Sequence, residues 1–266
     1  MELTGIMHCH ASYSYDAQMS LLEIKALCQK KGIQFVCMTE HTDELTPERA
    51  ADFVRECGVL SDDTFLFIPG FEVPFMKAHI LMIGERTFSG TYAGTIDALK
   101  KWTSTAPFVV LAHPVRNHFE VRDALLEEID ALEVWNQQYE GKRVPRTRSL
   151  RLFDTLRLKK PALVATGGVD FHRAPHFGAP FITLNATVFS EFDILEKLKI
   201  GAFRIHSDEA SLYGVLPNAP ALISLYRWKS LRSVWIITVG KWVNALLAQL
   251  GIRFPKQLTQ FVRSRV

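Results

Sequence analysis

The sequence has 266 residues, of which 48% are hydrophobic and 22% charged, and its net charge is +3. This length and composition suit one large globular domain, and no low-complexity tract or fixed-period repeat is present, which excludes fibrous, repeat and disordered classes. The four cysteines form no Cys-x-x-Cys pair, which argues against a disulfide framework and a thiolate zinc finger. The first residues lack a basic segment followed by an apolar run, so we expect a cytoplasmic protein.

Short apolar runs rich in Val, Ile, Phe and Leu alternate with longer amphipathic stretches, a pattern typical of parallel strands covered by helices. The runs predict strands at 4–7, 34–38, 65–68, 79–83, 108–111, 131–134, 162–165 and 181–184. Ser20 and Glu23 form a capping box that predicts a helix ending at Gly32, and Thr46 before Pro47 predicts the start of a second helix. Further helices are predicted at 95–104, 121–129, 145–159 and 190–199. The predicted fold class is therefore α/β.

Several predicted strands run directly into residues that can bind a metal. These residues are His8 and His10, His41, Glu72, His113, and Asp170 with His172. In a closed parallel barrel the carboxyl ends of the strands converge on one face, where residues from distant parts of the chain meet. We therefore expect these side chains to gather on one face of the molecule.

The spacing of these residues supports a shared site. His8 and His10 are two residues apart on a strand, so their side chains point to the same side and Cys9 to the other. A single His-x-His pair is as often a chance occurrence or a satisfied core pair as a metal site. Asp170 and His172 repeat the spacing, after two glycines that allow a close backbone approach. With Asp16, His41, Glu72, His79 and His113, the sequence offers nine nitrogen and oxygen donors.

The donor types indicate which metal is bound. Imidazole and carboxylate donors suit Mn, Fe or Zn better than Ca or Mg, and the absence of cysteine argues against a structural zinc. Nine donors exceed the need of one ion, so we expect two or three divalent transition metal ions, with Glu72 as the bridging carboxylate. Bridged ions favour hydrolysis, because they generate hydroxide near neutral pH and neutralise the oxygens of a phosphate.

The residues in order along the chain resemble the successive motifs of the PHP (polymerase and histidinol phosphatase) superfamily. The matching segments are His8-Cys9-His10 through Asp16, Thr39 to Asp43, Gly70 to Val73, Ala78 to Ile80, Leu111 to Pro114 and Gly168 to His172. The resemblance covers residues 1 to about 210 and fills all nine ligand positions. It implies a distorted (β/α)7 barrel with a trinuclear metal site and phosphoesterase activity.

The resemblance also implies how the ligands are shared. One ion would be held by His8, His10, Glu72 and Asp170, a second by Glu72, His79 and His113, and a third by Asp16, His41 and His172. Glu72, Asp170 and His10 are the expected catalytic residues. Asp16 stands where some members of the superfamily carry His, so the third ion could be held more weakly or be of another kind.

The substrate is less well indicated than the metals. Arg116 and Arg173 follow ligand motifs and are candidate phosphate-binding residues, with a solvated charge at the rim as the alternative. His118 and His176 are candidates for protonating a leaving group, or ordinary loop histidines. The leading interpretation is hydrolysis of a small phosphomonoester, such as a nucleotide, by metal-bound hydroxide. The alternatives are a nuclease or phosphodiesterase acting on oligonucleotides, and a non-catalytic metal-stabilised docking module.

The end of the chain differs from the rest in charge. Every acidic residue lies at or before Glu209, and eight Lys or Arg follow it. We therefore divide the chain into a barrel domain at 1–210 and a basic, apolar helical extension at 211–266. Residues 227–266 could cover the barrel or form a dimer interface, lie on the inner, anionic face of a membrane, or bind nucleic acid. The sequence leaves the oligomeric state open.

Overall fold

The computed structural model describes residues 1–216 and 219–249. It contains all eight predicted strands: β1 (Glu2–Cys9), β2 (Phe35–Met38), β4 (Leu66–Ile68), β6 (Ala78–Ile83), β7 (Phe108–Leu111), β8 (Ala131–Asn136), β9 (Val164–Gly168) and β10 (Phe181–Asn185). Four further strands were not predicted: β3 (Glu40–His41), β5 (Gly70–Phe75), β11 (Phe203–His206) and β12 (Ser211–Tyr213).

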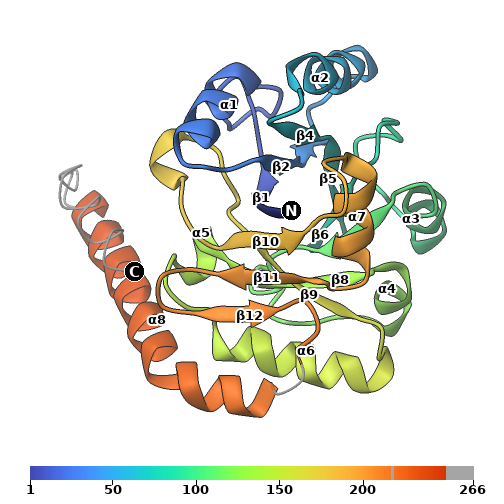
Figure 1. The fold of residues 1–266 in the computed structure, drawn as a ribbon. Helices are drawn as coiled ribbons and strands as arrows, with labels where there is room; N and C mark the ends of the chain where they lie inside the picture. The colour runs from blue at the N-terminus through green and yellow to red at the C-terminus, as the bar shows by residue number, and fades with distance from the viewer. Residues whose placement is uncertain (217–218, 250–266) are drawn as a thin grey trace.

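The helices lie outside the strands (Figure 1). The six helices predicted within the barrel are present: α1 (Leu21–Lys30), α2 (Pro47–Leu60), α3 (Ile96–Thr103), α4 (Asp123–Glu128), α6 (Thr147–Lys159) and α7 (Glu191–Lys199). Ser20 and Glu23 form the predicted capping box of α1, which buries Leu21, Ile24 and Cys28 against the barrel. A short helix, α5 (Gln137–Glu140), and a 3-10 turn at Ala174–His176 were not predicted.

The strands form two sheets. Two long strands are each interrupted by one residue, and the two halves of each belong to different sheets. The sheet orders are β12-β11-β10-β1-β2-β4 and β3-β5-β6-β7-β8-β9. β2 continues into β3 past Thr39, and β4 continues into β5 past Pro69. Beyond β9, the amide of Val169 donates to the Met7 carbonyl (2.9 Å) and that of Phe171 to the His8 carbonyl (3.1 Å), which joins β9 back to β1. The predicted distorted (β/α) barrel is therefore confirmed, with seven strand positions around it.

The strands are not all parallel, which the alternation of strands and helices did not indicate. β6 is antiparallel to both β5 and β7, and β10 is antiparallel to β1. Only Met76 and Lys77 separate β5 from β6, and so short a connection makes a hairpin, because a parallel crossover needs a dozen or more residues. As a result, the amino end of β6, which carries His79, lies at the same face as the carboxyl ends of its neighbours.

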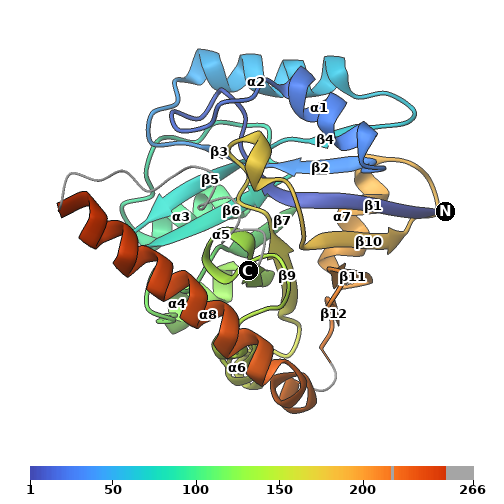
Figure 2. The same cartoon turned by 90° about the vertical axis from the view of Figure 1, so that its left-hand side faces the viewer.

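The extension forms one long helix, α8 (Ala219–Gln249), that packs against α6 and α5 (Figure 2). β12 pairs with β11, so residues 211–213 belong to the sheet, and the division of the chain at 210 stays a prediction. Across residues 1–216 and 219–249, no helix combines the length and apolar character needed to cross a membrane. Arg253, Lys256, Arg263 and Arg265 of the predicted basic extension lie outside the described residues.

Candidate metal centre

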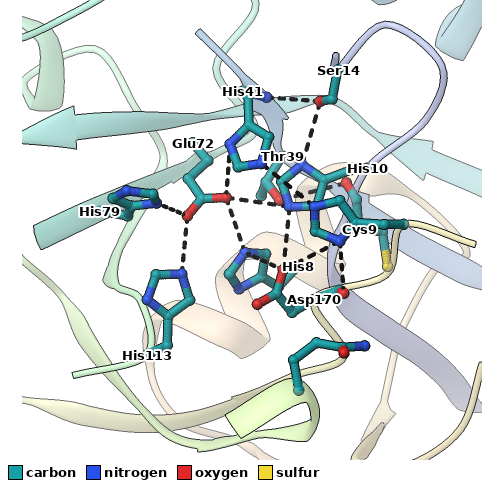
Figure 3. A network of polar contacts seen from close by, with 12 residues as sticks. His8, Cys9, His10, Ser14, Thr39, His41, Glu72, His79, His113 and Asp170 are labelled. Carbon is teal, nitrogen blue, oxygen red and sulfur yellow. Dashed lines mark hydrogen bonds and ion pairs between the residues drawn. The ribbon is translucent and has the colours of Figure 1, made fainter. Parts of the chain in front are cut away.

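The carboxylate of Glu72 on β5 lies at the centre of a group of imidazoles (Figure 3). Its side chain is buried, and its two oxygens face different histidines. Oε2 is close to three ring nitrogens, those of His8 (3.1 Å), His10 (3.2 Å) and His41 (3.3 Å). Oε1 is close to His113 Nε2 (3.1 Å) and to His79 Nδ1. A carboxylate placed in this way has the geometry of a bridging ligand.

The other two carboxylates complete the group from either side. Oδ1 of Asp170 is 3.6 Å from His8 Nε2 and 3.8 Å from His10 Nε2, on the barrel interior. Asp16 is more exposed, and its oxygens lie 3.5 Å from His41 Nε2 and 3.2 Å from His172 Nε2. The structure thus brings all nine residues proposed as ligands together on one face.

The donor atoms also lie close enough together to share metal ions. Four triplets have one donor atom each within 4.8 Å of the others: His10, His41 and His172; His8, His10 and Glu72; His8, His113 and Asp170; His41, Glu72 and His79. Buried His113 Nδ1 has no hydrogen-bond partner within the described chain. Buried imidazole nitrogens normally find a partner, so the donor set fits bound cations.

The backbone is strained where three of these residues lie. His8, His113 and Asp170 have φ angles of 63°, 23° and 54°, in a region that non-glycine residues seldom occupy. At His8 the pairing of β1 with β2 shifts register, so a bulge turns the side chain toward Glu72. Strain of this kind costs on the order of 1–3 kcal/mol per residue and clusters at functional sites.

Burial and neighbouring charges set the protonation of the group. Burial, followed by the charge of His41, lowers the pKa of His10 to about 3. Burial alone would raise the pKa of Glu72, but His8, His10 and His113 outweigh it and hold that pKa well below its usual range. Burial would lower the pKa of His41, but the contacts with Asp16 and Glu72 raise it to about 9. An ionised Glu72 beside neutral His10 is the state that metal binding requires.

A second buried carboxylate, Glu133 on β8, supports the group from behind. Its Oε1 is 2.9 Å from His8 Nδ1, and its Oε2 accepts hydrogen bonds from the His113 amide (2.6 Å) and from Asn136 Nδ2 (2.9 Å). This leaves His8 Nε2 as the nitrogen that faces Glu72. Glu133 was not predicted as a site residue. Its one signal in the sequence was an acid inside an otherwise apolar strand.

Glu40 and Ser14 hold the loop that carries Asp16. Buried Glu40 accepts from the Ala11 amide (2.7 Å) and from Ser14 Oγ (2.5 Å), and Ser14 Oγ accepts from the His41 amide (2.9 Å). Burial raises the pKa of Glu40 to about 7. These two residues were also missed, because only the folded chain shows that Glu40 contacts Ser14 and that Ser14 contacts the His41 amide.

The backbone at Gly168 lies close to Glu133 and His8, as expected from the two glycines that precede Asp170. A Cβ atom on this residue would lie 1.8 Å from Glu133 Oε1 and 2.7 Å from His8 Cβ. No side chain fits there without moving both residues. Gly168 therefore contributes to the site by leaving room for the side chains of Glu133 and His8.

An open cavity of about 610 Å³ lies over the group. Arg116, Arg173 and His176 line it, as do Tyr15, Gln138 and Tyr139, which were not predicted. Nε of Arg173 donates to Nε2 of His176 (2.8 Å). His118 is exposed and is not among the residues that line the cavity, and its carbonyl accepts from Arg148. Three of the four candidate substrate residues thus reach the cavity.

Comparison with known proteins identifies the fold. No protein-family model and no curated protein matches the sequence. Among solved structures, a two-domain protein from Bacteroides vulgatus containing a predicted PHP-like metal-dependent phosphoesterase is similar, with a TM-score of 0.60, 15% identity, and coverage of 80% of this chain and 66% of that one. A lesion-specific endonuclease from Pyrococcus furiosus gives a TM-score of 0.54 and 16% identity, over 77% of this chain and 58% of that one. The chain therefore spans less than two thirds of either protein and has the fold of PHP-like metal-dependent phosphoesterases.

Proposed function

We propose that this chain, which has the fold of the PHP-like metal-dependent phosphoesterases, belongs to that superfamily and hydrolyses phosphate esters. The observation that carries the proposal is Glu72, whose two oxygens face two separate sets of imidazoles. A structural metal site closes around one ion with four ligands, whereas this group opens onto a cavity and offers more donors than one ion needs.

Two or three ions of Mn, Fe or Zn are the proposed cofactors. The sets of ligands are His8, His10, Glu72 and Asp170 for one ion, Glu72, His79 and His113 for a second, and Asp16, His41 and His172 for a third. Asp16 has the most exposed side chain of the nine, at 40%, which supports a weaker third position. When bound, such cations supply an activated water and neutralise charge on the phosphate.

The residues around the cavity would bind and orient the substrate. Arg116 is exposed at the rim, and its guanidinium can take two phosphate oxygens at once. The contact with His176 fixes the orientation of the Arg173 guanidinium, so less rotational freedom is lost on binding. Glu72, Asp170 and His10, at the centre of the group, would orient the reacting centre.

A small phosphomonoester, such as a nucleotide, is the preferred substrate class. The cavity volume lies in the range of small-molecule sites, and both arginines line it. A nuclease or phosphodiesterase is the second candidate, because one of the similar structures is an endonuclease and the exposed Tyr15 can stack on a base. A purely docking role is less well supported, since none of the nine donors is replaced.

The proposed compartment is the cytoplasm. All four cysteines are free and buried, as expected for a protein in a reducing environment.

The test is phosphate release after loading with Mn, Fe or Zn. The panel contains nucleotides, sugar phosphates, a phosphotyrosine peptide and short oligonucleotides, with Asp170→Ala beside wild type. Asp154→Ala is the matched control, because Asp154 is exposed on α6 and far from the cavity. Metal-dependent release that is lost only in Asp170→Ala supports the proposal. A metal-loaded protein that releases phosphate from no substrate and cleaves no oligonucleotide would exclude it.

A further inference from the structure

Helix α8 has two faces of different character. One face is buried against the barrel at Tyr226 and Ser230. Tyr226 Oη donates to the Ser211 carbonyl (3.2 Å), and Ser230 Oγ accepts from the Thr147 amide (3.2 Å). These contacts hold the first part of α8 in a fixed orientation, which determines where the opposite face points.

The opposite face is an exposed apolar stripe, defined by Trp228, Leu231, Trp235, Val239, Trp242 and Leu246. These residues are spaced three or four apart, so they line one side of the helix. Their exposed fractions run from 38% to 78%, and each of the three tryptophans is at least 67% exposed. Contiguous exposure of large apolar side chains on this scale marks an interaction surface.

The charges around the stripe are all of one sign. No Asp or Glu follows Glu209 in the sequence, whereas Arg227 and Arg232 flank the stripe within α8. Lys229 is held by an ion pair with Glu209 (3.2 Å), and no ion pair involving Arg227 or Arg232 is found over residues 1–216 and 219–249. The surface therefore complements an anionic partner.

The residue types of the stripe indicate which kind of partner binds it. A second copy of the helix would bring its arginines against these arginines, which is unfavourable. A single-stranded nucleic acid would stack on the tryptophans but gains nothing from Leu231, Val239 and Leu246. Tryptophan rings at the boundary of lipid and water, aliphatic side chains below them and arginines reaching back to the headgroups fit a lipid surface.

We propose that α8 docks the protein on an anionic membrane surface, with the stripe inserted at the level of the lipid headgroups and Arg227 and Arg232 on lipid phosphates. The helix lies along the surface without crossing it. α5, which carries Gln138 and Tyr139 of the cavity lining, contacts α8 (Figure 2). The docking does not depend on the proposed hydrolysis.

The experiment measures co-sedimentation of the full chain with vesicles of phosphatidylcholine alone and of phosphatidylcholine with phosphatidylglycerol in equal parts. We expect binding to the anionic vesicles, with weaker binding as salt is added. Three of the five tryptophans lie in the stripe, so the fluorescence maximum should shift to the blue on binding. The triple variant Trp228→Ser, Trp235→Ser, Trp242→Ser should bind more than about tenfold more weakly.

The matched control is the triple variant Val59→Ser, Leu158→Ser, Phe192→Ser, which removes equally exposed apolar side chains from α2, α6 and α7 and should bind like wild type. Arg227→Gln, Arg232→Gln should weaken binding to anionic vesicles only. Equal binding of the two triple variants, or no binding to anionic vesicles, overturns the proposal. A dimer in light scattering that the tryptophan variant dissociates, or stripe-dependent binding of an oligonucleotide in place of vesicles, also overturns it.

Discussion

Nδ1 of His8 lies 2.9 Å from Oε1 of Glu133, although 125 residues separate the two in sequence. The contact fixes which nitrogen of His8 carries the proton and therefore which one faces the metal site. Carboxylates behind metal-binding histidines act in this way, because they orient the ring and raise its basicity as a ligand.

Glu133→Gln is therefore expected to weaken metal binding by about 10- to 100-fold while the protein stays folded. The neutral amide still accepts a hydrogen bond from His8 but no longer supplies a negative charge. Isothermal titration with Mn or Zn measures the affinity, and circular dichroism checks the fold. Glu127→Gln, at an exposed position on α4, is the control and should bind as wild type does. An unchanged affinity in Glu133→Gln would mean that the contact serves folding alone.

Asp16→Ala and Asp170→Ala should lose different amounts of metal. Among the described residues, Asp16 forms ion pairs with His41 and His172, and its side chain is exposed, so its removal should release one ion and leave the others bound. Asp170 is buried beside His8 and His10, so its removal should also disturb the ions near Glu72. Elemental analysis after gel filtration measures the metal content of each variant. The same metal content in both would contradict the proposed division of ligands.

Gly168→Ala should destabilise the protein by at least about 2 kcal/mol, because the added methyl group meets Glu133 and His8 in a packed interior. Gly58→Ala provides the contrast. Gly58 lies in α2 with nothing within 4 Å of its would-be Cβ, so alanine there should stabilise by about 0.5–1 kcal/mol. Urea unfolding of both variants gives the free energies. If Gly168→Ala is as stable as wild type, the interior is looser than the structure indicates.

Glu140 should make stability depend on pH. Burial raises the pKa of this residue to about 8, although Ser149, the Arg146 amide and the Arg146 charge act in the opposite direction. In the unfolded chain the pKa is about 4.3. Between these values the folded state binds more protons than the unfolded state, so this contribution to the free energy of unfolding is present below about pH 4.3 and is lost as the pH rises to 8.

Glu140→Gln removes that titration. We expect the variant to lose less stability than wild type between pH 5 and pH 8, by about 3–4 kcal/mol. Urea unfolding at both pH values, on protein prepared in the same metal state, measures the difference. Parallel pH curves for the two proteins would show that Glu140 is ionised at neutral pH in the folded state.

The sequence was sufficient to predict most of the strands and the gathering of the nine proposed donors on one face, for a physical reason. Each of His8, Glu72 and His113 lies in or directly after an apolar run, and the carboxyl ends of barrel strands meet on one face. The direction of β6 was missed because β5 was not predicted. Only once β5 is seen to end at Phe75 does the two-residue connection at Met76 and Lys77 require a hairpin.

Other features could not be predicted from the sequence. The role of Glu133 follows only from its contact with His8. No local sequence pattern connects two residues so far apart in the chain. His118 and Arg116 lie close together in the sequence, yet only Arg116 lines the cavity, because the backbone turns at His118 with φ of 58°. The sequence predicted a basic, apolar helical extension, but only packing showed which side of α8 the barrel covers.

The crowding around Gly168 also limits how this protein can change over generations. A substitution there collides with Glu133 and His8, so the inner layer of the site tolerates little drift in its sequence. At the rim, Arg116 is exposed, and Tyr15 is exposed although its ring stacks on that of His41. New preferences among small ligands can therefore arise by replacement at the rim, while the interior is inherited unchanged.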